Sequence, residues 1–173
     1  MDFKKNSFMS VLVILFLFLL DGQLSTLLMN LSPAFTSISI HLVFIYALHR
    51  INRDSFQLLF ITYIFLGFLY DIYYFNFIGF ATSLFPMTIL LIYFFNRNVY
   101  FVGLTRLLSF LVVLFLLEIF SFLIASLFNM TDLSVSVFVF FNLLPTLICN
   151  LLLFFLTLPL FENFSQSEQD IEM

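Results

Sequence analysis

Several residue types that carry chemistry are scarce in this chain of 173 residues. Cys149 is the only cysteine, which excludes an intrachain disulfide and a thiolate metal cluster. The four glycines form no phosphate-binding loop, and the six Lys and Arg residues form no basic patch for nucleic acid. No His, Cys and Glu cluster has metal-ligand spacing, and no Ser or Cys nucleophile has a base nearby. We therefore expect no enzymatic activity, no cofactor and no nucleic-acid partner.

Apolar residues are what the chain has in abundance. Hydrophobic residues make up 63% of it, charged residues 9%, and the mean hydropathy is +1.16. Soluble domains carry about 25% charged residues, so the lipid bilayer is the solvent that this composition fits. The fold class that we expect is an all-α membrane protein.

The apolar runs predict six transmembrane helices joined by short loops. A span needs roughly 20 apolar residues, and the runs that we assign are 7–28, 33–49, 55–72, 79–96, 104–128 and 134–161. Pro33 suits the first turn of the second helix. Residues 1–161 would form the membrane domain, and residues 162–173 a disordered, acidic cytoplasmic tail.

The basic residues predict the orientation. All of them fall on one side of the predicted topology, before the first span, between the second and third, and around the loop between the fourth and fifth. They are Lys4, Lys5, Arg50, Arg53, Arg97 and Arg106. Because Lys and Arg are retained in the cytoplasm, both termini are expected to be cytoplasmic.

Three acidic residues, Asp21, Asp71 and Glu118, lie at membrane depth away from the loops and the tail. A charge there costs roughly 2.5–3.5 kcal/mol on insertion scales. We expect no basic residue in the outer half of the membrane to pair with them. They could be protonated because of desolvation, bond to amides and hydroxyls, or reach water or a partner chain. Their role is either a polar cluster for a partner, proton or solute, or contact between helices.

Asp71 lies near the end of the third span, between Gly67 and Gly79. Neither glycine has a side chain, so a neighbouring helix or the returning chain could approach closely. Contact with a partner and a local helix cap are equally open for Asp71.

The sixth span carries Asn142, Pro145 and Asn150, and the fourth carries Pro86. A proline within a helix removes a backbone hydrogen bond and should bend the helix, with neighbours satisfying the freed carbonyl. Asn142 should lie close in depth to Glu118. His41 falls in the middle of the second span, where a hydrogen-bonded packing role is more expected than metal ligation.

These residues resemble the MreD family of rod shape-determining membrane proteins. The segment Gly67-Phe68-Leu69-Tyr70-Asp71-Ile72, followed by Gly79 and Pro86, is similar to the family's glycine–aspartate–glycine segment. The run Leu144-Pro145-Thr146-Leu147, with Asn150 and Pro159, is similar to its C-terminal helix. The likeness covers residues 5–164, although Asn142 stands near where a basic residue would be expected.

The resemblance implies a non-enzymatic scaffold in elongation-mode peptidoglycan synthesis in the bacterial cytoplasmic membrane. It also implies an MreC-like bitopic partner, a RodA-type glycosyltransferase, a penicillin-binding transpeptidase and MreB, and a fold like the substrate-binding subunits of energy-coupling-factor transporters. Gly67, Asp71 and Gly79 would contact the partner. The alternative is a small-solute, vitamin-type transport subunit, but the first span lacks the small residues with which such subunits grip their coupling protein.

Overall fold

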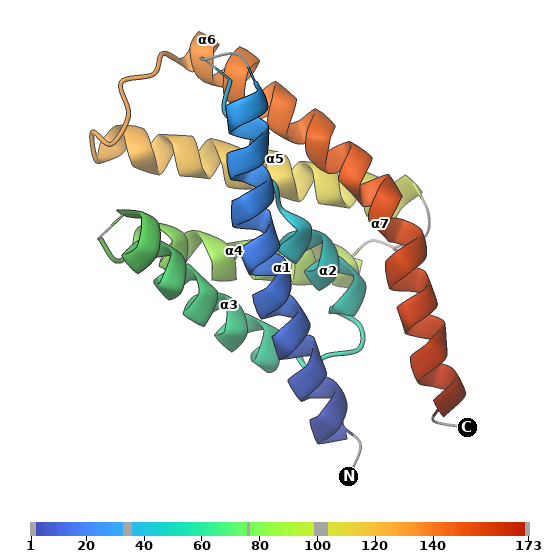
Figure 1. Ribbon diagram of the computed structural model, residues 1–173. Coiled ribbons are helices and arrows are strands. Elements are labelled where there is room, and N and C mark those ends of the chain that lie inside the picture. Colours follow the sequence, from blue (N-terminus) through green and yellow to red (C-terminus); the bar gives the residue numbers. More distant parts are fainter. Residues whose placement is uncertain (1–2, 33–35, 76, 99–103, 172–173) are drawn as a thin grey trace.

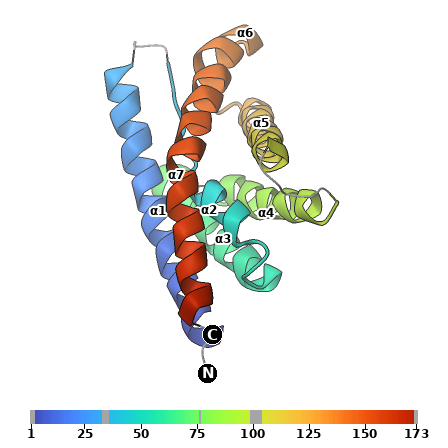
Figure 2. The same cartoon turned by 90° about the vertical axis from the view of Figure 1, so that its right-hand side faces the viewer.

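The computed structural model describes residues 3–32, 36–75, 77–98 and 104–171, and within them there are helices and connecting segments but no strand. Both chain ends lie at the lower end of the molecule in Figures 1 and 2. The elements in chain order are α1 (Phe3–Leu31), α2 (Leu42–Arg50), α3 (Phe56–Tyr70), the π-helical turn η1 (Asp71–Phe75), α4 (Phe80–Asn98), α5 (Leu104–Leu127), α6 (Val135–Phe138), the π-helical turn η2 (Val139–Leu143) and α7 (Leu144–Ile171).

Helical stretches long and apolar enough to cross a membrane occur at five places in the described chain. They are Met9–Leu31, Phe56–Tyr74, Phe80–Arg97, Thr105–Leu127 and Val135–Pro159. They coincide within a few residues with the first, third, fourth, fifth and sixth predicted spans. The expectation of an all-helical protein with several membrane-spanning helices is therefore confirmed.

The second predicted span, residues 33–49, is wrong as a continuous helix. Residues 36–41 form no helix and follow an open, extended path in Figure 2, and α2 has only nine residues; Pro33 lies outside the described residues. Ser and Ile alternate over residues 37–40, a pattern of period two that favours extended backbone. At about 3.3 Å per extended and 1.5 Å per helical residue, residues 36–50 still cover ~33 Å, the thickness of a bilayer core. The chain can therefore cross the membrane here as a broken helix, which Figure 2 shows descending from the upper end of α1.

The short helix α2 lies at the centre of the bundle. α1, α4 and α7 pack around it, and all of its residues except His49 are buried. A helix that is apolar on all sides suits such a position. Tyr63 on α3 adds a hydrogen bond from its hydroxyl to the carbonyl oxygen of Val43, 2.6 Å away. The helical part of the second apolar run thus belongs to the protein core.

α3 and α4 form a closely packed hairpin, and α4 packs in turn against α5. A Cβ atom at Gly67 would lie 2.5 Å from the carbonyl oxygen of Ala81 and 2.7 Å from the Cα of Thr82. Only glycine fits at this distance, so Gly67 lets the returning chain come close. α4 runs as one helix through Pro86.

The sixth span is interrupted by the π-helical turn η2, which ends two residues before Pro145. Pro145 has no N–H to donate to the carbonyl oxygen of Phe141. The N–H of Ser37 donates to that oxygen instead, at 3.0 Å. The carbonyl freed by the proline is therefore satisfied by the extended segment before α2, as lipid surroundings require.

The end of the chain differs from the expected disordered tail. α7 continues to Ile171, so residues 162–171 are helical. Glu and Gln have good helix propensity, and no glycine or proline follows Pro159 to end the helix.

Candidate functional site

The backbone at the break before α2 is bonded by side chains from two other helices. An α-helix leaves its first N–H groups without internal partners. On α1, Asp21 accepts hydrogen bonds from the N–H of Leu42 at 2.8 Å and of Val43 at 3.0 Å. The hydroxyl of Ser25, one turn further along, accepts from the N–H of Ile40 at 2.8 Å. Asp21 thus caps a helix other than its own.

α7 bonds the same segment from the other side. The Asn150 side chain accepts from the N–H of His41 at 2.8 Å and donates to the carbonyl oxygen of Ser39 at 2.6 Å. The Thr146 hydroxyl accepts from the N–H of Ser39 at 3.1 Å. Residues 39–43 thus each donate their N–H to a side chain. Asn150 and Thr146 are completely or almost completely buried, at 0% and 1% exposed.

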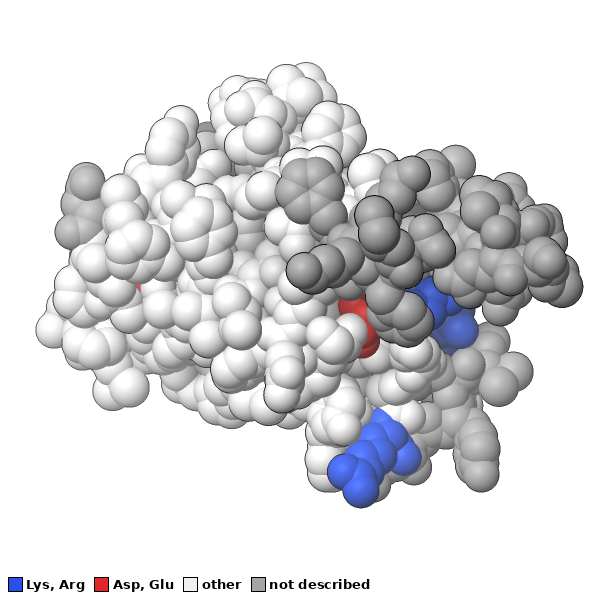
Figure 3. Space-filling model, turned by 90° about the horizontal axis from the view of Figure 1, so that it is seen from below, with Lys and Arg blue, Asp and Glu red and all other residues white. Residues whose placement is uncertain are grey.

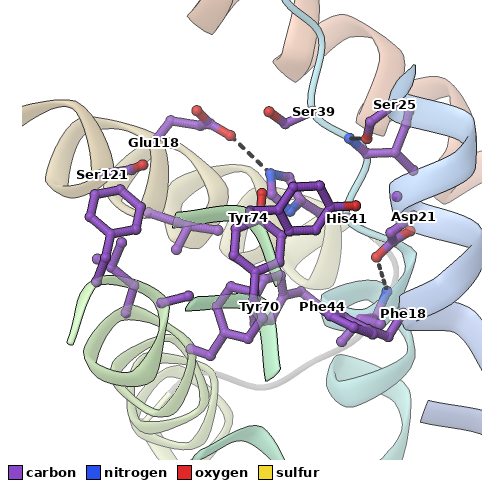
Figure 4. A pocket seen from close by; sticks show the side chains of 18 of the residues that line it. Phe18, Asp21, Ser25, Ser39, His41, Phe44, Tyr70, Tyr74, Glu118 and Ser121 are labelled. Atoms are coloured by element: carbon purple, nitrogen blue, oxygen red, sulfur yellow. Dashed lines mark hydrogen bonds and ion pairs between the residues drawn. The ribbon is translucent and has the colours of Figure 1, made fainter. Parts of the chain in front are cut away.

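Glu118 on α5 pairs with His41, which immediately precedes α2. Glu118 Oε1 and His41 Nε2 are 2.8 Å apart (Figure 4). Our expectation that no basic residue could pair with these acids is wrong for Glu118, because its partner is the histidine of the second predicted span. The break in the second span moves His41 from the middle of a helix to a helix start, where its ring reaches α5.

Asp71 is used within the chain as a helix cap. Its two carboxylate oxygens accept hydrogen bonds from the N–H groups of Gly79, Ala81 and Thr82 at 2.6–3.0 Å, and from the Thr82 hydroxyl at 2.8 Å. A carboxylate at a helix N-terminus also interacts favourably with the helix dipole. Gly79 has φ +129°, a conformation that favours glycine. Asp71 is 0% exposed, so these contacts agree with the local-cap alternative.

The remaining candidates on the last span are not gathered with the others. Asn142 lies in η2 and is half-buried, and its side chain makes no hydrogen bond to another described residue. Pro145 acts through the freed carbonyl of Phe141 described above.

A cavity of about 180 Å³ brings three of the polar residues together. Asp21, His41 and Glu118 line it, whereas Asp71, Asn142 and Asn150 do not. Figure 4 shows it between α1, the extended segment, α5 and the α3–α4 pair. In the part of the chain that the structure describes, no three His, Cys, Asp or Glu residues lie close enough to hold a metal ion.

At the end of the molecule where the termini lie, sequence reasoning missed a buried polar network. Arg50 Nη2 and Nε each donate to the Asp54 carboxylate at 3.0 Å, and the Ser10 hydroxyl donates to it at 2.6 Å. Arg50 and Asp54 are each 9% exposed. The spacing of four residues between these opposite charges is the sequence signal that could have identified the pair. Figure 3 looks onto this end and shows Lys and Arg side chains, with an acidic side chain close to one of them, among mainly uncharged residues in the part that is not drawn in grey.

Comparison with known proteins finds similarity over most of the chain. The family model described as "rod shape-determining protein MreD" matches residues 5–168. This chain belongs to the MreD family. The cell shape-determining protein MreD of Streptococcus pneumoniae (strain ATCC BAA-255 / R6) is 32% identical to it over 142 residues, 82% of this chain and 85% of that protein.

Membership of the MreD family gives the chain a role in cell shape and, with its apolar helices, a place in a membrane as a multi-pass protein. The family is one of cell shape-determining proteins and not a known enzyme family. No solved structure matches the chain significantly, so the likeness to energy-coupling-factor subunits stays a prediction.

Proposed function

We propose that this MreD-family protein is a non-enzymatic scaffold of the bacterial cytoplasmic membrane that binds an MreC-like bitopic protein. Through that partner it would organise elongation-mode peptidoglycan synthesis, with a RodA-type glycosyltransferase, a penicillin-binding transpeptidase and MreB as further members of the assembly. Family membership supports the role in cell shape, and the surface of α1 supports the contact with a partner helix.

One face of α1 presents an apolar stripe with a single amide in it. Leu12, Phe16, Leu19 and Leu27 are 44%, 61%, 66% and 55% exposed. With Gln23 they recur every three or four residues, so they lie along one side of the helix. Gln23 is exposed and makes no hydrogen bond to another described residue.

An amide that faces hydrocarbon is costly unless another polar group meets it. Hydrogen bonds between transmembrane helices contribute about 0.6 kcal/mol on average and up to about 1.7 kcal/mol. A single membrane-spanning helix that offers a polar group at the depth of Gln23 would satisfy it. The acids of the core are unsuited to this role, because Asp71 and Asp21 already bond the protein's own backbone.

Co-purification of the MreC-like partner tests this proposal. Gln23→Leu should reduce the amount of captured partner roughly 3- to 18-fold, the effect of losing 0.6–1.7 kcal/mol. Gln57→Leu is the matched control, because Gln57 is also exposed but lies on α3. Undiminished capture by Gln23→Leu at equal membrane levels would exclude α1 as the contact face. Loss of capture in both variants would point to a general effect of removing an amide.

A further inference from the structure

The cavity beside α2 has a composition that suits one class of ligand. Its walls come from α1, the extended segment with α2, the end of α3 with η1, and from α4 and α5. A buried cavity of about 150 Å³ can hold benzene. The volume of about 180 Å³ is therefore sufficient for a group of the size of ethanolamine or choline.

Acidic side chains outnumber basic ones in the wall of the cavity. Asp21 and Glu118 are carboxylates, His41 can balance at most one of them, and no Lys or Arg lines the cavity. Both oxygens of Asp21 accept backbone N–H groups. An anionic ligand would therefore find no cation to pair with, whereas a cation would be attracted.

Glu118 keeps one oxygen available. The residue is 9% exposed, and its Oε1 bonds His41. Its Oε2 makes no hydrogen bond to any residue in the described chain. This oxygen is not completely buried, so it can accept a hydrogen bond from a donor that enters the cavity. The Ser121 hydroxyl, one turn further along α5, also lines this wall.

Aromatic rings cover much of the remaining wall. Tyr70 lies 4.5 Å from Tyr74, 5.6 Å from Phe85 and 6.2 Å from Phe18, measured between ring centroids, and Phe44 lies 5.3 Å from Phe85. In the view of Figure 4, Tyr70 and Tyr74 lie between Glu118 on one side and Asp21 on the other. Ring faces attract ammonium groups, and the attraction reaches about 2 kcal/mol where water is excluded.

We propose that this cavity binds an organic ammonium group, a primary amine or a trimethylammonium, carried by a free solute or by a lipid headgroup. The Glu118 carboxylate pairs with the positive charge, and the rings of Tyr70, Tyr74 and Phe44 surround it. The site is separate from the α1 face assigned to the partner helix, so each proposal can fail without the other.

Equilibrium binding to the purified full-length protein in an uncharged maltoside detergent tests the site. The probes are choline, ethanolamine and 3,3-dimethylbutanol, a neutral molecule with the shape of choline. We expect choline or ethanolamine to bind at least 10-fold more tightly than the neutral molecule. Equal affinity for all three, or no binding by any, would overturn recognition of the charge in free solutes.

A lipid arm separates the two sources. Short-chain phosphatidylcholine and phosphatidylethanolamine are compared with phosphatidylglycerol in the same detergent. Preference for the amine headgroups with no binding of the free amines assigns the ligand to lipid, and binding of the free amines assigns it to a solute. Absence of an ammonium preference in both arms overturns the proposal.

Variants locate the binding. Glu118→Gln keeps the size of the side chain and should weaken ammonium binding at least 10-fold. Tyr74→Leu, which removes a ring from the wall, should also weaken it, whereas Tyr73→Leu should not, because Tyr73 is 79% exposed and does not line the cavity. Unfolding of each variant can be followed through the thiol of Cys149 to confirm that it is folded. Unchanged affinity in Glu118→Gln and Tyr74→Leu would place any bound ammonium elsewhere.

Discussion

Asn150 on α7 donates a hydrogen bond from Nδ2 to the carbonyl oxygen of Ser39, 2.6 Å away and 111 residues earlier in the chain. The same side chain accepts from the N–H of His41 through Oδ1. It therefore satisfies a backbone acceptor and a backbone donor of a segment that has no helix of its own. In a membrane, non-helical backbone is tolerated only where the protein supplies such partners. The extended stretch before α2 thus depends on the last span.

Asn150→Leu should destabilise the protein strongly. It leaves the Ser39 carbonyl and the His41 N–H without partners, at about 1–3 kcal/mol for each buried group. Unfolding by dodecyl sulfate in mixed micelles, followed by circular dichroism, measures the loss. Asn142→Leu is the control, since the side chain of Asn142 makes no hydrogen bond to another described residue, and it should change the stability little. Equal midpoints for the two variants would contradict the role of Asn150.

Asp71→Ala should lower stability because four donors lose their acceptor at the start of α4. Removing a capping side chain costs about 0.5–2 kcal/mol, and burial of the unpaired N–H groups adds to this. Asp71→Asn keeps one acceptor oxygen and should lose less than Asp71→Ala. Unfolding by dodecyl sulfate, measured as above, compares the stability of these two variants with that of the unaltered protein. An unchanged midpoint together with lost partner capture would instead make Asp71 a contact residue.

Gly67→Ala should force α3 and α4 apart. The added methyl would lie 2.5 Å from the Ala81 carbonyl oxygen, a backbone atom that cannot move aside without shifting α4. Overpacking of this kind costs typically 1–3 kcal/mol. Gly22→Ala is the matched control, because its methyl meets only the hydroxyl of Tyr74, at 2.8 Å, and that side chain can turn away. Similar unfolding midpoints for the two variants would show that the helix pair can relax.

Much of the fold was predictable from the apolar runs, because each long helix must be about as long as the bilayer is thick. The second span was not. Its length and hydropathy fitted a helix, while the alternation of Ser and Ile before His41 indicated extended backbone and received no weight. Whether such a segment is helical depends on partners 15 to 111 residues away, such as Ser25 and Asn150. Sequence periodicity cannot report these partners.

The polar residues were identified correctly as features that need an explanation, because polar groups at membrane depth are costly. Their partners could not be assigned. Asp21 was given no particular partner, yet it caps α2, and Glu118 was expected to have no basic partner although His41 lies 2.8 Å away. Both assignments require the break before α2, so one error in secondary structure hid the contacts of two acids.

The orientation of the chain gives a further prediction, which rests on the position of the basic residues. Asn52 lies in the turn between α2 and α3 and Asp132 in the connection between α5 and α6, and both are exposed. Under the positive-inside rule the first is cytoplasmic and the second is external. Each is replaced by cysteine in a Cys149→Ser background, and intact cells are treated with a membrane-impermeant maleimide. We expect Asp132→Cys to be labelled and Asn52→Cys to be labelled only after the cells are opened. The reverse pattern would mean either that the protein is inverted in the membrane or that the broken segment over residues 36–50 does not cross it. Labelling of both from outside would mean that α3, α4 and α5 do not all cross the membrane.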